Sequence, residues 1–196
     1  MVDAGIGRLL ISSLHQAIGD VAPTRLEFYE SWLTPSGMRD GRIGLAPLGA
    51  VLSFLHREGP PVNDQIAIRA GTWAADWTYT DVSRPRRWLI RRMPAAIRVR
   101  STFGLARRLV RATVRQSKVN ARMHGVAGVV EIRSTAFEQL RDPASIPMRG
   151  FYGAALRRLL AQCAVDAEVA VATEHETGWS FTVTLRSTAR VDPDAA

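Results

Sequence analysis

Residues 151–186 decide the fold, and they read FYGAALRRLLAQCAVDAEVAVATEHETGWSFTVTLR. The first part predicts a helix, because apolar side chains recur at every fourth residue, at Phe151, Ala155, Leu159 and Cys163. The period then changes to two, over residues 167–173 and again over residues 178–186. Two alternating segments separated by a short polar loop with glycine predict an antiparallel hairpin. Its second strand should face the core with Trp179, Phe181, Val183 and Leu185.

Upstream of this stretch the sequence is dominated by helical spacing. Apolar side chains recur every three or four residues in segments that punctuating Gly and Pro residues separate. We expect helices over residues 6–18, 23–33, 47–56, 63–79, 83–94 and 95–123, a loop over 34–41, and a strand over 125–133. That strand should join the hairpin in one antiparallel sheet. The sequence therefore predicts an α+β domain over residues 1–190, with a helix-rich N-terminal half, a small antiparallel sheet packed on helices, and a flexible tail over 191–196.

Composition bounds the class of protein. A chain of 196 residues with 46% apolar and 22% charged residues fits one globular domain. No run approaches 18 apolar residues, and Asp3, Arg8 and His15 interrupt the N-terminal stretch where a secretory signal would lie. The single cysteine, Cys163, cannot form an internal disulfide. We therefore expect a cytoplasmic protein, with any membrane contact peripheral.

Charge is strongly segregated along the chain. Residues 82–130 contain no Asp or Glu, but they hold twelve arginines and Lys118, a charge of +13. The remainder carries a charge of −5, although the whole chain has +8. On a helix over 95–123, one edge would carry Arg100, Arg107, Arg111, Arg115, Lys118 and Arg122.

Such a basic edge has two interpretations. It is either a solvated helix face whose arginine stems cover apolar surface, or a surface for an anionic partner. Nucleic acid is the least favoured partner, because no helix-turn-helix or RNP-type motif accompanies the charge. The edge, together with the arginines of residues 84–92, predicts a salt-sensitive affinity for anionic bilayers.

Several catalytic and cofactor motifs are absent from the sequence. There is no G-x-G-x-x-G after a strand, no Walker A lysine and no G-x-S-x-G elbow. The four histidines are scattered, with no pair at the spacing of a helical zinc site. We therefore expect no metal site and no redox cofactor of the protein's own.

Tryptophans form a second concentration. Trp73 and Trp77 are neighbours at i and i+4, and Trp88 lies among arginines. Spacing of this kind favours packing in the core for Trp73, and a pocket for a large apolar ligand is the alternative. In the pocket interpretation the helices of residues 63–79 and 95–123 lie side by side. The ligand-binding residues are then Trp73, Trp77, Trp88, Arg87, Arg91 and Phe103.

The order of these features resembles one family. A helix contains Ala70-Gly-Thr-Trp-Ala-Ala-Asp-Trp77, and a Pro- and Arg-rich connector, a long helix and a strand with Val129-Val-Glu-Ile132 follow. Next come Phe151-Tyr-Gly-Ala-Ala-Leu-Arg-Arg-Leu-Leu160 and a hairpin with Trp179-Ser-Phe-Thr-Val183. Over residues 45–186 this resembles bacteriochlorophyll 4-vinyl reductase and the wider 4-vinyl-reductase-like domains, which are similar in fold to TRAPP vesicle-tethering subunits.

The resemblance implies a TRAPP-like α+β fold with an apolar ligand pocket, often dimerising through helices. In the bacteriochlorophyll branch the implied ligand is a chlorin-type tetrapyrrole, a flat amphipathic molecule with carboxylates. The cysteines that many members carry are missing here, because the corresponding stretches read Ile146-Pro-Met-Arg-Gly150 and Thr173-Glu-His-Glu-Thr-Gly-Trp179. We therefore expect a protein that binds or presents a chlorin intermediate. The alternatives are a vinyl-group reductase, and a dimerising or membrane-docking interaction module without a ligand.

Overall fold

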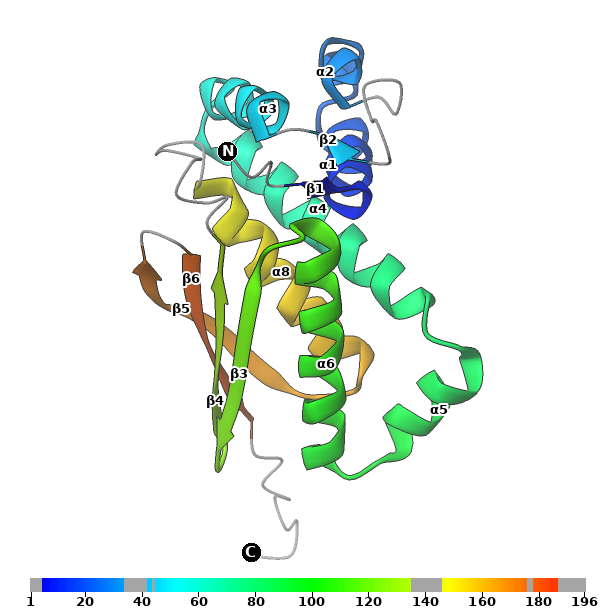
Figure 1. The fold of residues 1–196 in the computed structure, drawn as a ribbon. Helices are drawn as coiled ribbons and strands as arrows, with labels where there is room; N and C mark the ends of the chain where they lie inside the picture. Colours follow the sequence, from blue (N-terminus) through cyan, green and yellow to red (C-terminus); the bar gives the residue numbers. More distant parts are fainter. Residues whose placement is uncertain (1–4, 34–41, 44, 135–145, 176–177, 187–196) are drawn as a thin grey trace, which may run out of the picture.

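A four-stranded antiparallel sheet and two layers of helices make up the body of the molecule (Figure 1). The structure is a computed structural model that describes residues 5–33, 42–43, 45–134, 146–175 and 178–186. The strand order is β3 (Lys118–His124), β4 (Ala127–Arg133), β6 (Gly178–Leu185) and β5 (Ala167–His175). Helices α6 (Ala95–Thr113) and α8 (Ile146–Gln162) pack on the sheet, and α4 (Pro60–Thr80) and α1 (Arg8–Val21) form the layer beyond them. The chain is therefore α+β, as predicted.

The remaining elements surround this body. A 3₁₀ turn (Pro23–Arg25) leads into α2 (Leu26–Leu33), and α3 (Leu45–Arg57) precedes α4. The two-residue strands β1 (Ile6–Gly7) and β2 (Arg42–Ile43) pair with each other. Helix α5 (Arg84–Arg92) links α4 to α6 and projects from the body (Figure 1). The loop expected over residues 34–41 and the tail expected over 191–196 lie outside the described residues.

The C-terminal hairpin has the predicted arrangement. Strands β5 and β6 pair with each other, and β4 pairs with β6, so all three lie in one antiparallel sheet. Trp179, Phe181 and Val183 are buried, and Leu185 at the end of the strand is partly buried. Cross-strand partners of this row are buried as well, since Ile132 lies opposite Trp179 and Val130 opposite Phe181. The alternation therefore directs one face of the sheet to the helices, as expected.

The single helix expected over residues 95–123 is wrong. Helix α6 ends at Thr113, and residues 118–124 form strand β3 instead. Two consecutive β-branched residues end the helix, because Thr113 turns its hydroxyl back to the carbonyl of Val110 and Val114 adopts an extended conformation. The next seven residues alternate exposed and partly buried side chains, which is the strand period.

Gly71 sets the distance between α4 and α8. A Cβ at this position would lie only 2.1 Å from the Phe151 carbonyl oxygen, so no larger residue fits without moving a helix backbone. Gly104, in α6, is the opposite case, because a Cβ there would meet no atom within 4 Å.

These two glycines provide a matched test of the packing. We expect Gly71→Ala to lower the free energy of unfolding by at least about 2 kcal/mol, because the helices must separate. Gly104→Ala should raise the free energy of unfolding by about 0.5–1 kcal/mol, because alanine has a higher helix propensity than glycine at an exposed position inside a helix. Urea unfolding followed by circular dichroism measures both. Equal effects of the two substitutions would contradict the close approach of α4 and α8.

Candidate functional site

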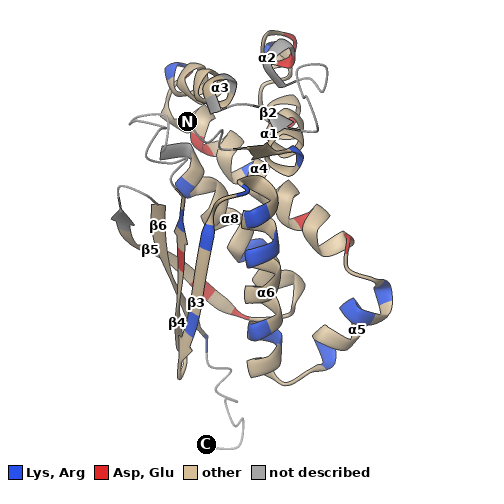
Figure 2. Ribbon diagram, viewed as in Figure 1, with Lys and Arg blue, Asp and Glu red and all other residues tan. Residues whose placement is uncertain are grey.

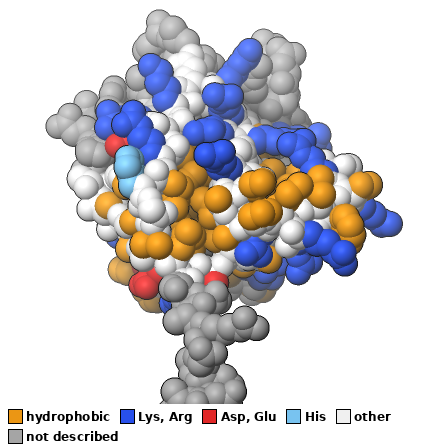
Figure 3. Space-filling view, turned by 90° about the horizontal axis from the view of Figure 1, so that it is seen from below, with side chains coloured by type: hydrophobic (Ala, Val, Ile, Leu, Met, Phe, Trp, Pro, Cys, Tyr) orange, Lys and Arg blue, Asp and Glu red, His pale blue; other side chains and the backbone are white. Residues whose placement is uncertain are grey.

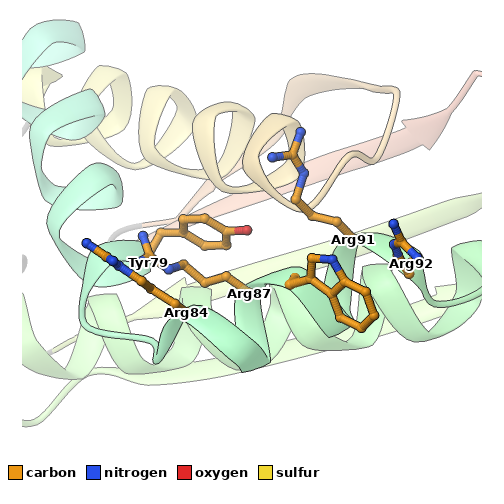
Figure 4. Close-up of a pocket in the computed structure, with 6 residues that line it drawn as sticks. Tyr79, Arg84, Arg87, Arg91 and Arg92 are labelled. Carbon is orange, nitrogen blue, oxygen red and sulfur yellow. The ribbon is translucent and has the colours of Figure 1, made fainter.

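A pocket lies where the C-terminal end of α4 meets α5. It has a volume of about 440 Å³, within the range of small-molecule sites. Its lining consists of one residue of α4 and five of α5, namely Tyr79, Arg84, Arg87, Trp88, Arg91 and Arg92 (Figure 4). We call this hollow the α4–α5 pocket.

The sequence of α5 places these side chains together. Prolines delimit the helix, because Pro85 lies in its first turn and Pro94 starts the following helix. Within it, residues 84, 87, 88, 91 and 92 follow the i, i+3, i+4, i+7, i+8 spacing of one helix face. Ile90 faces the other way and is the one residue of α5 that is buried. The face toward the pocket therefore carries four arginines and one tryptophan.

Tyr79 lies at the base of the pocket. Its side chain is 9% exposed, and its hydroxyl has no hydrogen-bond partner within the described part of the chain. Figure 4 shows the hydroxyl directed between Arg87 and Arg91. Burial raises the pKa of this hydroxyl, so at neutral pH it is a hydrogen-bond donor. The hydroxyl oxygen is shielded from solvent, so Tyr79 contributes its ring rather than its hydroxyl to the lining of the pocket.

The arginines of the pocket are available to an anion. No carboxylate among the described residues forms an ion pair with Arg84, Arg87, Arg91 or Arg92. The Arg92 guanidinium lies 4.3 Å from the centre of the Trp88 ring, and that of Arg87 lies 5.7 Å from the centre of the Tyr79 ring. The pocket thus combines aromatic faces with arginines that have no ion-pair partner among the described residues, which complements an anionic amphiphile.

Half of the expected ligand-binding residues lie in this pocket. Arg87, Trp88 and Arg91 line it, whereas Trp73, Trp77 and Phe103 do not. Helices α4 and α6 are in contact as expected, but Phe103 is a core residue that packs over Gly128 of β4. Sequence reasoning missed Tyr79, Arg84 and Arg92. The helical spacing from Arg84 to Arg92 is a signal that would have found the two arginines.

Trp73 and Trp77 belong to a separate cluster against α1. The Trp73 indole nitrogen donates to the Asp20 carboxylate at 2.8 Å, and Arg69 pairs with the same carboxylate at 2.7 Å. The Trp77 ring packs on the Trp73 ring at 5.7 Å between centres, and both side chains are half-buried. The donors lower the pKa of Asp20, with the Trp73 bond the largest cause. The cluster therefore joins α4 to α1.

The six basic residues expected on one helix edge lie on two elements and the turn between them. Arg100, Arg107 and Arg111 lie on α6, Arg115 lies in the turn that follows, and Lys118 and Arg122 lie on β3. Figure 2 shows Lys and Arg along both α6 and β3. Arg107 donates to the Ala121 carbonyl oxygen at 3.3 Å and so connects the helix to the strand. The six residues do not form a continuous helical stripe, because the helix ends at Thr113, before Arg115.

No protein-family model matches this chain. A search of curated proteins also returned no match. Within the described ranges, no three His, Cys, Asp or Glu side chains gather in a way that could hold a metal ion. Among the helices that the structure describes, none has the length and apolar character needed to cross a membrane.

The Asp20 cluster makes a pH-dependent contribution to stability. Because folding lowers the pKa of Asp20, its contribution is complete above the ordinary value of 3.8 and is lost as the pH falls through the lowered value. We expect Asp20→Asn to lower the melting temperature at pH 7, and the difference from the unmodified protein to shrink at acid pH. Thermal unfolding at both pH values measures it, with Asp64→Asn as the control. A difference that does not depend on pH would contradict the assignment.

Proposed function

We propose that this protein binds an anionic amphiphile in the α4–α5 pocket, and that the ligand is a chlorin-type tetrapyrrole. One observation carries the proposal: four arginines and Trp88 line the α4–α5 pocket, and none of the four arginines forms an ion pair with a carboxylate among the described residues. The tetrapyrrole itself comes from the resemblance to 4-vinyl-reductase-like domains. The α+β arrangement, with a helix-rich N-terminal half and a C-terminal antiparallel sheet, supports a TRAPP-like member of that family.

Each part of the pocket has a role toward such a ligand. Arg87 and Arg91 are one helical turn apart and line the same pocket, so their two guanidinium groups suit one carboxylate. Trp88 is 57% exposed at the rim and offers a ring face for the edge of the macrocycle. The remaining part of a large flat ligand extends out of the pocket along the surface.

A carrier role follows from this chemistry. The lining residues hold a carboxylate and a ring, and binding of this kind needs no electron source. Presentation of a pigment intermediate to another enzyme is therefore the form of the proposal that these residues support. A vinyl-group reductase is the alternative, and incubation of the purified protein with a divinyl chlorin and reduced nicotinamide separates the two. We expect no turnover by the protein alone.

Binding of pheophorbide, a chlorin with a free carboxylate, tests the pocket. We expect the fluorescence anisotropy of pheophorbide to rise with protein concentration, and its methyl ester to bind more weakly. Arg87→Gln combined with Arg91→Gln should weaken binding at least about tenfold, because charge-assisted hydrogen bonds are lost.

A matched double variant controls for net charge. Arg111→Gln combined with Arg115→Gln removes the same two charges outside the pocket and should leave the affinity within about twofold, since distant charges are screened. Equal weakening by both double variants would show a non-specific charge effect. Absence of binding by the unmodified protein would refute the tetrapyrrole proposal.

A further inference from the structure

An exposed apolar strip crosses the end of the molecule that carries α5. Viewed from below, a band of apolar side chains runs between groups of Lys and Arg side chains (Figure 3). Four apolar side chains at this end are strongly exposed: Trp88 57%, Leu89 46%, Ile97 43% and Val126 63%. They come from α5, from the first turn of α6 and from the turn between β3 and β4, which all lie at the lower end in Figure 1. We call these four residues the apolar strip.

The surroundings of the apolar strip are basic. Exposed arginines lie on the same elements, at Arg84, Arg86, Arg91, Arg92, Arg100 and Arg122. Among the carboxylates near this end, Asp81 pairs with Arg108 at 3.1 Å and Glu168 lies 4.0 Å from Arg186, and the exposed Asp166 lies beside Arg186. The strip is therefore an apolar surface whose border on α5 and α6 is cationic.

A second hollow lies between α5 and α6, beside the strip. It has a volume of about 390 Å³, and its lining includes Arg86 and Arg100 together with Ile90 and Ile97. Cationic and apolar side chains thus share one recess that opens at the strip. This combination suits a phosphate headgroup whose acyl chain lies against the apolar side chains.

An anionic bilayer fits these observations better than the other polyanions. Tryptophan and arginine beside aliphatic side chains are typical of residues at the membrane interface, where rings enter the headgroup region and guanidinium groups remain with the phosphates. Nucleic acid would use the arginines but would leave Leu89, Ile97 and Val126 in water. The strip also spans three separate elements at one end of the molecule, which suits a flat partner.

We propose that the apolar strip docks this protein on the surface of an anionic bilayer. Trp88, Leu89 and Ile97 enter the interfacial region, and the surrounding arginines contact lipid phosphates. This inference goes beyond the proposed function, because docking requires no chlorin. It also joins the two surfaces, since Trp88 belongs both to the strip and to the rim of the α4–α5 pocket.

Flotation with vesicles tests the docking in the absence of chlorin. We expect the full chain to float with vesicles of phosphatidylcholine and phosphatidylglycerol, and not with phosphatidylcholine alone. Raising the ionic strength from about 0.1 M to about 1 M shortens the Debye length from about 10 Å to about 3 Å and should release the protein. Leu89→Glu combined with Ile97→Glu should reduce partitioning at least about tenfold, because two apolar side chains no longer enter the interface.

The control variant carries the same change on another face. Ile68 and Val171 are each 45% exposed, on α4 and β5, so Ile68→Glu combined with Val171→Glu adds the same charge away from the strip. This control should float as the unmodified protein does. Both variants should have the circular dichroism spectrum of the unmodified protein, which shows that they are folded. Without vesicles, the Leu89→Glu, Ile97→Glu protein should still bind pheophorbide, which separates membrane docking from ligand binding.

Three results would overturn the proposal. These are equal flotation with neutral and anionic vesicles, equal loss in the strip variant and the control variant, and failure of the unmodified protein to float. Binding of duplex DNA that the strip variant retains in full, without flotation, would instead assign the arginines to nucleic acid.

Discussion

The backbone contact between Gly71 and Phe151 is the constraint on which the candidate site depends. Helix α8 lies between the sheet and α4. Because Gly71 has no side chain, α4 and α8 approach until the backbone of Phe151 occupies the space that a Cβ of residue 71 would need. This approach brings the end of α4 to the end of α8, where Tyr79 is buried close to Cys163, and burial first, with Cys163 second, raises the pKa of the Tyr79 hydroxyl. Tyr79 is thereby held at the base of α5, and the pocket forms over it.

The sheet and the helix layers can be predicted from local sequence patterns. The end of α6 cannot, because no Gly or Pro marks it. Alternation of apolar residues over 127–133 and 178–185 is strong enough to specify strands and their buried face. Without such a residue, the helical spacing of apolar side chains continues past Thr113, and the helix predicted over residues 95–123 therefore included β3. The alternating sequence Lys-Val-Asn-Ala-Arg-Met-His over residues 118–124 was the competing signal, and pairing with β4 through the turn at Gly125 decides in its favour.

The candidate site was predictable only where its residues are neighbours in sequence. Arg87, Trp88 and Arg91 lie within one short helix, so their common face follows from helical geometry. Tyr79 could not be found in this way, because its burial depends on α8, which follows it in the chain by many residues. Trp73 was misplaced for the same reason. Its hydrogen-bond partner Asp20 lies on α1. The i, i+4 spacing of Trp73 and Trp77 within α4 gives no information about a contact with another helix.

The stability of helix α5 depends on what its arginines bind. Arg87 and Arg91 are like charges at i and i+4, and the first turn holds no acidic residue to complement the helix dipole, so both effects disfavour the isolated helix. Ile90 is its one buried side chain, so packing gives little compensation. Arg91 and Arg92 in the last turn do complement the dipole. An anion that bridges the arginines removes the repulsion, and a ligand that binds only the folded form stabilises it by mass action. The anionic partner that we propose for the pocket or for the apolar strip would therefore also stabilise the helix that presents them.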